Sequence, residues 1–273
     1  MRQSLLVLLV LSLLSGLFGC RENITEVGNP SDVNGVVMAG PIGKAHVLIY
    51  QLQEDGSLGK ELGSATTAVD GTFTLPVTSA GPVAIFAKGG EYTDEATGVL
   101  THNDPLQPLV AWLPSLETAQ DISVTPLTTV AAMRGQALLS LGLKQAITKS
   151  VEEVEDLFDL KNISITKTHP HDLTNPHESF HPSSAATRYG AILAAISQSA
   201  LDNQVPLEKT AQHIQNLARD FSDGVLDGKE NAQDISFQDL PPPSNWVSSL
   251  KESLSHFLKG PKNKSKLSPE ELS

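Results

Sequence analysis

The chain has 273 residues, a formal net charge of −12 at neutral pH and a single cysteine. So acidic a surface argues against nucleic acid as a partner, and against binding to anionic lipid head groups by charge alone. With one cysteine there is no internal disulfide, so the fold depends on packing. The length is sufficient for two modest domains, each with a core of its own.

The first nineteen residues have the order of a secretory signal. Arg2 precedes an apolar run from Leu5 to Leu14, and small residues follow as far as Gly19. This run is too short to cross a bilayer. The only cysteine, Cys20, stands where a signal peptidase would cut. An ordinary signal peptide with a chance cysteine is the alternative interpretation.

The segment from Leu17 to Cys20 resembles the lipobox of bacterial lipoproteins, although Phe18 departs from the usual small or aliphatic residue. The resemblance implies that residues 1–19 are removed and that Cys20 is lipidated, which anchors the protein to the lipid bilayer without spanning it. It also implies a location in the cell envelope. In a Gram-negative cell, Arg21 after the cysteine favours the outer membrane.

Residues 20–31 are polar and are broken by Gly28 and Pro30, so they predict a short flexible tether. From residue 32 to 124, short β-rich runs alternate with turn signals at Gly40-Pro41, Asp55-Gly56 and Asp70-Gly71. Strands at this spacing predict an antiparallel β-sandwich of about one hundred residues.

The β-rich region carries a second resemblance. Its residues are similar to the carboxypeptidase regulatory-like, transthyretin-type sandwich of many bacterial surface lipoproteins, through the patterns Val33-x-Gly35-x-Val37, Gly40-Pro41-Ile42, Ala45-x-Val47 and Thr66-Thr67-x-x-Asp70-Gly71-x-Phe73-x-Leu75. The resemblance implies a transthyretin-like or Ig-like fold. Domains of this kind mostly act as spacers, adhesive modules or accessory domains.

A glycine-bounded loop at 89–98 brings three carboxylates together in sequence: Glu91, Asp94 and Glu95. Carboxylate oxygens in one turn are ligands for a hard cation such as calcium. A solvated loop is the alternative interpretation. The loop also resembles a recurring arrangement in bacterial lipoproteins of unassigned role.

After Pro126 the apolar spacing becomes helical. Helices are predicted at about 127–143, 145–160, 183–201 and 206–221, which makes residues 125–228 a small helical bundle. Residues 229–243 predict a linker, and 260–273 a disordered tail. Between them, 244–259 predicts an amphipathic helix that packs back on the bundle or docks to a partner or membrane surface. The expected fold class is α+β multidomain.

Four of the eight histidines fall in one short segment: His169, His171, His177 and His181. Neutral imidazoles at such spacings are ligands for zinc or copper. His177 and His181 have the His-x-x-x-His spacing, but three prolines interrupt the segment and argue against the helix that would bring the two rings together. An exposed histidine-rich connector is therefore the competing interpretation.

A second metal motif begins at Asp223. Asp223, Asp227 and Asp234 follow the spacing of an EF-hand calcium loop, but Val225 stands where a ligand is expected and the last position is Asp instead of Glu. Alternatively, Gly224 and Gly228 simply end a helix and turn the chain.

The motif Gly-x-Ser-x-Gly does not occur in the chain, and Ser-x-x-Lys occurs at 57–60, 164–167 and 248–251 without the further motifs that accompany it in serine hydrolases. His-Glu-x-x-His occurs once, at 177–181, but Pro176 and Pro182 bound it and leave too short a stretch for the helix that a zinc protease needs. The sequence therefore predicts a membrane-anchored envelope lipoprotein that acts without catalysis as a binding, adhesive or structural module, with an envelope protein or polysaccharide as partner. No cofactor is expected. The alternatives are a zinc- or copper-binding lipoprotein that uses the histidine segment, and a hydrolase whose site no local motif reveals.

Overall fold

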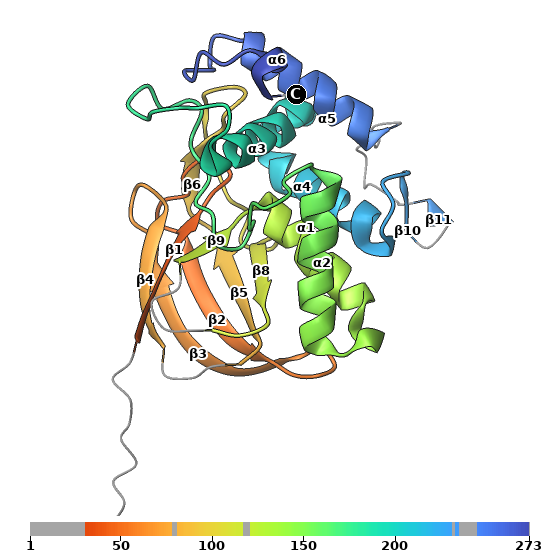
Figure 1. Cartoon of the computed structure of the whole chain (residues 1–273). Helices are drawn as coiled ribbons and strands as arrows, with labels where there is room; N and C mark the ends of the chain where they lie inside the picture. Colours follow the sequence, from red (N-terminus) through yellow and green to blue (C-terminus); the bar gives the residue numbers. More distant parts are fainter. Residues whose placement is uncertain (1–30, 78–80, 117–120, 231–232, 235–244, 273) are drawn as a thin grey trace, which may run out of the picture.

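A computed structural model describes residues 31–77, 81–116, 121–230, 233–234 and 245–272, and it combines sheets with helices in an α+β fold (Figure 1). The predicted signal peptide, Cys20 and the tether up to Pro30 lie outside the described residues. So does most of the predicted linker 229–243, of which two short strands are described, β10 (Lys229–Glu230) and β11 (Gln233–Asp234).

Two sheets form the β part. One has the strand order β4-β1-β9, with β1 at Ser31–Val37, β4 at Thr72–Val77 and β9 at Asp121–Val124. The other has the order β3-β2-β5-β8, with β2 at His46–Leu52, β3 at Leu58–Thr66, β5 at Val83–Lys88 and β8 at Leu109–Leu113. A short hairpin joins β6 (Glu91–Thr93) to β7 (Leu100–His102).

The turn before β4 forms as its sequence predicts, although it connects β3 in one sheet to β4 in the other and is therefore not a hairpin. Asp70 Oδ1 accepts hydrogen bonds from the Thr72 backbone N–H at 3.1 Å and from the Thr72 hydroxyl at 2.7 Å, and Gly71 takes a positive φ of 79°. Along β4, Phe73 and Leu75 are buried and alternate with exposed residues, as expected for a strand with one face on the core.

One pairing differs from the antiparallel expectation. β9 runs parallel to β1, with Gly35 opposite Ile122 and Val37 opposite Val124. Because β8 belongs to the other sheet, the chain changes sheets before β9 and arrives beside β1 in the same direction. The close approach requires a glycine at position 35, where a Cβ would lie 2.8 Å from the carbonyl oxygen of Ile122.

The four helices predicted between 127 and 221 all form. They are α1 (Pro126–Ala137), α2 (Leu143–Leu157), α3 (Ala185–Asp202) and α4 (Thr210–Asp220), and α5 (Trp246–Lys259) and α6 (Pro269–Leu272) follow. One-turn 3-10 helices occupy Leu139–Leu141, Leu207–Lys209 and Phe221–Asp223. Thr125 caps α1, and Pro126 is its first residue, which is the position in a helix that tolerates proline best.

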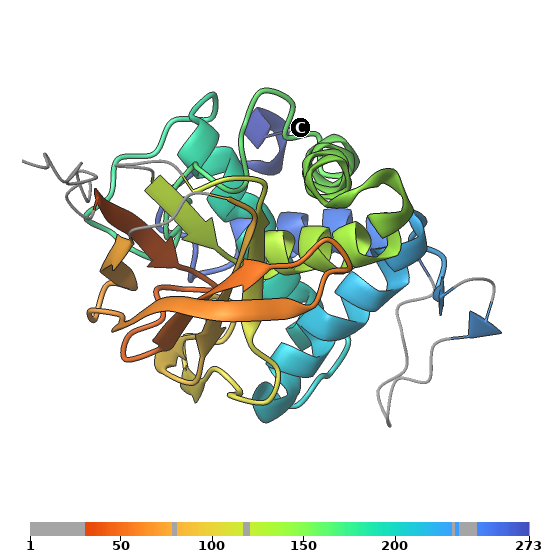
Figure 2. The same ribbon diagram turned by 90° about the horizontal axis from the view of Figure 1, so that it is seen from below.

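The sheets and the helices share one hydrophobic core, although the sequence predicts a domain boundary between 124 and 125. Leu127 and Val130 of α1 belong to the same buried cluster as Val36 and Ile49 of the strands. In Figures 1 and 2 the first helices lie directly beside the strands. Almost the whole surface of α1 in its first two turns is buried, because β8 covers one side and α2 and α4 cover others.

The C-terminal residues up to 272 also differ from the expected disordered tail. The Lys264 backbone N–H donates to the Leu173 carbonyl at 2.8 Å, and Leu267 is buried. The Asn263 amide ties the segment further by donating to the carbonyls of Leu258 and Leu267. A few apolar anchors therefore outweigh a composition that is typical of disorder.

Candidate functional site

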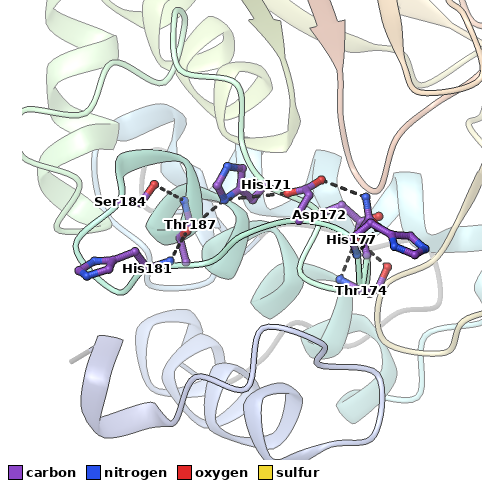
Figure 3. A network of polar contacts seen from close by, with 9 residues as sticks. His171, Asp172, Thr174, His177, His181, Ser184 and Thr187 are labelled. Atoms are coloured by element: carbon purple, nitrogen blue, oxygen red, sulfur yellow. Dashed lines mark hydrogen bonds and ion pairs between the residues drawn. The ribbon is translucent and has the colours of Figure 1, made fainter.

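The structure does not bring the four predicted histidine ligands together. His169, His177 and His181 are exposed and His171 is half-buried. In Figure 3 the rings of His171, His177 and His181 point in different directions. A shared metal requires imidazole nitrogens that converge on one point at about 2 Å. The histidines are neighbours in sequence only.

Hydroxyl groups hold this segment in place. The Thr187 hydroxyl lies 3.1 Å from His171 Nδ1 and accepts the His181 backbone N–H at 3.4 Å (Figure 3). Asp172 Oδ1 accepts from the backbone N–H and the hydroxyl of Thr174, at 2.8 and 2.6 Å. The His171 ring also packs edge-on against Phe180. The segment is therefore an ordered loop that side-chain hydrogen bonds hold in place.

The same segment is pressed against α3. The His171 backbone N–H donates to the Ala186 carbonyl at 2.9 Å, and a Cβ at Gly190 would lie only 2.0 Å from the His171 carbonyl oxygen. Glycine is therefore needed at 190 for the loop to approach the helix so closely.

The residues of the predicted calcium loop shape a turn around a different carboxylate. Asp220, which is fully buried, accepts the backbone N–H groups of Asp227 and Gly228 at 3.1 and 3.0 Å. Asp223 and Asp227 accept from the N–H groups two residues further on. The backbone of Asp234 pairs with Lys229, and its side chain lies outside the described residues.

The three carboxylates of loop 89–98 separate into two groups. Glu91 forms an ion pair with Lys44 on the exposed side. Asp94 is buried: its Oδ1 accepts from the Thr97 N–H at 2.9 Å and the Thr97 hydroxyl at 2.7 Å, and its Oδ2 accepts from the Ser197 hydroxyl at 2.8 Å. The loop is therefore tied to α3, and the expectation that it is solvated is wrong for Asp94.

Glu95 is the most unusual ionisable group in the fold. Its side chain is 2% exposed, and its Oε2 has no hydrogen-bond partner among the described residues. Burial raises the pKa of Glu95 well above its ordinary value, and the nearby charges of Asp172 and Asp94 raise it further. The carboxyl is therefore held in its neutral form across a wide pH range.

Within the described ranges, no group of three or more His, Cys, Asp or Glu side chains is arranged to hold a metal ion. Glu91, Asp94 and Glu95 do not converge, and neither do the four histidines. The described aspartates of the 223–234 motif are already occupied by backbone donors.

A different site emerges at the helical end of the molecule, in a depression that we name the α3–α5 groove. It consists of two adjoining cavities of about 200 and 470 Å³. Five residues line both cavities: Phe158, Asp159, Ile192, Lys251 and Leu254. Most of the other lining residues are apolar, and they are Leu157, Leu160, Ala191, Ala195, Leu226, Val247, Leu250, Pro269 and Leu272, together with Arg188 and Ser255.

Helical periodicity builds the two walls. On α5, Val247, Lys251 and Leu254 are spaced four and three residues apart, so they share one face. On α3, Arg188, Ile192 and Ala195 repeat the same spacing. The end of α2, at Leu157 and Phe158, closes a side of the groove.

The opposite face of α5 fixes this wall in place. Trp246 and Phe257 are 1% exposed, and Asp202 at the end of α3 accepts a hydrogen bond from Ser253 at 2.7 Å and lies 3.0 Å from His256 Nδ1. The helix therefore packs back on the bundle, which is one of the two alternatives from the sequence. Its Val247 edge stays 40% exposed.

Two cations and one carboxylate line the groove. Arg188 donates to the Asp159 backbone carbonyl at 2.9 Å, and the carboxylate of Asp159 lies 3.7 Å from the same guanidinium. Lys251 is exposed and forms no hydrogen bond or ion pair with a described residue. In a chain of net charge −12, this groove is locally cationic.

The sequence revealed the apolar stripe of 244–259 but not the groove. A helical stripe cannot by itself show that one edge faces the core and the other edge faces a depression. The detectable signal was its width: Trp246, Val247, Leu250, Leu254, Phe257 and Leu258 cover more of the helix than one neighbour can bury.

Comparisons with known proteins leave the chain without an assigned family. No protein-family model matches it, and no curated protein matches it significantly. Among solved structures it is similar to a 9R-lipoxygenase from Cyanothece PCC8801, at 10% identity and a TM-score of 0.22, over 70% of this chain and 25% of that one. The match thus spans a quarter of that protein's length, and a TM-score this low supports no conclusion about the fold or function of this chain. No helix in the described ranges is long and apolar enough to cross a membrane.

Proposed function

We propose that this protein is a cell-envelope lipoprotein that is anchored through a lipidated Cys20 and acts without catalysis as a binding module, with the α3–α5 groove as its binding site. The observation that carries the binding role is the groove itself, an apolar depression with a few charged groups at its rim, which is the usual composition of a ligand site.

The position of the groove supports this role. In Figure 1 the described chain begins with β1 at the end of the molecule opposite α5 and α6. Residues 20–31 extend over at most about 40 Å when stretched. An anchor at Cys20 would therefore leave the groove at the end that faces away from the membrane, where it is open to a ligand.

For the β part, we propose a transthyretin-type sandwich with one departure, the parallel β9. Phe73 and Leu75 of one sheet share a buried cluster with Val47 and Ile49 of the other, which supports two sheets that pack face to face. As in that class of domain, this part would act as a spacer between the anchor and the binding end.

Lipidation can be tested by expressing the whole chain in a Gram-negative host with an alkyne analogue of palmitate. We expect the wild-type protein to take up the label and to fractionate with the outer membrane. Cys20→Ser should abolish the label and release the protein from membranes. Equal labelling or equal membrane association of the two forms would rule out the anchor.

Binding by the groove can be tested with the chain from Arg21, because every contact described above lies within residues 31–272. The probe is 1-anilinonaphthalene-8-sulfonate, an apolar anion that fluoresces when it leaves water. We expect Ile192→Asp to abolish the fluorescence increase. Val69→Asp, at a position 87% exposed and far along the chain from the groove, is the matched control and should leave it intact. Equal fluorescence in both variants would remove the groove as the site.

A further inference from the structure

We propose that the α3–α5 groove binds a free medium-chain fatty acid, with the hydrocarbon tail along the groove and the carboxylate at Lys251 and Arg188. This inference rests on the groove being a binding site, as proposed above, and it adds the chemical class of the ligand.

The lining suits a hydrocarbon chain. Between the two rows of side chains on α3 and α5, the described surface is formed mainly by Leu, Ile, Val, Ala and Phe. Val247 is 40% exposed, and Ile192, Leu226 and Leu254 are only partly buried. An apolar ligand would remove these side chains from water, which is the main driving force for association.

The charges at the rim favour an anion. Asp159 is already paired with Arg188, so Lys251 is the charge that the described residues leave without a counterion. Lys251 lines both cavities, and its aliphatic stem can lie along the apolar wall while its ammonium reaches water. Arg188 adds a planar donor group that matches a carboxylate in shape.

The size of the groove favours one chain over a helical peptide. Its lining spans residues 188 to 195 on α3 and 247 to 255 on α5, about two helical turns or roughly 12 Å. A peptide helix with its side chains is about 10–12 Å across. Cavities of about 200 and 470 Å³ are too narrow to enclose such a helix, but they suit a single extended tail.

The small size of the groove also favours a free fatty acid over a phospholipid as its ligand. A phospholipid would bring two chains and a bulky head group to a groove with one continuous floor. In addition, α5, which forms one wall of the groove, lies at the end of the fold opposite the start of β1 (Figure 1). We therefore assign the ligand as a free fatty acid and not as a lipid that remains in the bilayer.

The test titrates dodecanoate into the chain from Arg21, by calorimetry and by displacement of anilinonaphthalenesulfonate. We expect one site per chain and full displacement of the dye. Dodecanol and dodecyltrimethylammonium, which have the same tail without the negative charge, should bind at least tenfold more weakly. Vesicles of phosphatidylglycerol should not displace the dye.

Two charge variants make the test specific. Lys251→Glu should weaken dodecanoate binding at least tenfold and leave dodecanol binding unchanged. Lys144→Glu, at an exposed lysine on α2 outside the groove, is the matched control and should bind dodecanoate like the wild type. Circular dichroism of each variant verifies that the fold is intact.

Several outcomes would overturn the inference. Equal binding of dodecanoate and dodecanol, or an unaffected Lys251→Glu variant, would remove the carboxylate contact. Displacement by vesicles but not by dodecanoate would assign the groove to membrane lipid instead. If the dye binds and Ile192→Asp abolishes it, but dodecanoate does not compete, the groove remains a binding site and only the fatty acid is wrong.

Discussion

Two polar segments lie against α3, and they differ in what they do with their ionisable groups. The histidine segment 169–181 is attached through backbone and hydroxyl contacts, and its imidazoles are left at the surface. The loop 89–98 instead places Asp94 and Glu95 beneath the helix, where each is 2% exposed. The segment that the sequence marks as the best metal site is therefore exposed, whereas the buried ionisable groups lie in the loop 89–98.

Clustering of metal-binding side chains along the chain is therefore weak evidence for a metal site. Histidines in a proline-interrupted loop have no common face, so their rings diverge. Asp94 looks like a residue of a solvated turn, yet it accepts two hydrogen bonds from Thr97 and a third from Ser197, which lies 103 residues further along the chain. Substitutions in the two segments should therefore lower the free energy of unfolding by very different amounts.

The largest effect is expected for Asp94→Ala. The Thr97 N–H and the hydroxyls of Thr97 and Ser197 would lose their acceptor, and buried donors without partners are costly. We expect the free energy of unfolding to fall by about 3–4 kcal/mol, measured by urea denaturation. Glu91→Ala, in the same loop but exposed, is the control and should cost much less. Equal losses would contradict the burial described for the loop.

A buried histidine provides the next comparison. Burial lowers the pKa of His213 to about 4, so this ring is neutral in the fold while the unfolded chain becomes protonated below about 6.5. Its contribution is complete above pH 6.5 and is lost as the pH falls towards 4, by roughly 3 kcal/mol. His213→Gln should flatten this part of the stability profile relative to the wild type. Parallel profiles would show that folding does not lower the pKa of His213.

Glu95 should make the stability of the fold change with pH in the opposite direction. Its pKa is raised by burial, so stability is complete below its unfolded pKa and declines as the pH rises towards the folded pKa, by about 1.4 kcal/mol per pH unit. Glu95→Gln, which cannot ionise, should be more stable than the wild type at pH 7 and should lose this advantage near pH 4. A constant difference at all pH values would mean that folding does not raise the pKa of Glu95.

The smallest effect is expected in the histidine segment. Simultaneous replacement of His169, His177 and His181 by alanine should change the free energy of unfolding by no more than about 0.5 kcal/mol per site, since all three side chains are exposed. We also expect the affinity for zinc and copper to be unchanged, by calorimetric titration. Tight stoichiometric binding that disappears in the variant would revive the metal hypothesis.

Much of the local fold was predictable because its causes are local. The Asp70-Gly71 turn, the Thr125 cap with Pro126 and four amphipathic helices follow from turn chemistry, capping and periodicity. The parallel β1–β9 pair was not predictable, since it joins residues almost ninety positions apart. Nor was the shared core, because an apolar face on α1 does not identify the strand that covers it.

The groove was less predictable than the fold. It requires the end of α2, a wall of α3 and one edge of α5 to meet, and no motif within a single segment encodes that meeting. The four predicted histidine ligands do not converge for the same reason. Sequence spacing fixes which residues share a helix face, whereas a site depends on how faces from different elements are arranged.

The parallel β1–β9 pair also determines how this protein would respond to mechanical force. A pull between the N-terminal end of β1 and the helices after β9 acts at Ser31 and at Val124, which lie at opposite ends of the paired strands. Such a load slides the two strands along each other, so all the ladder hydrogen bonds resist it together and none can open in sequence. A chain held at its N-terminus and pulled from its helical end would therefore yield slowly, at a rate set by unfolding.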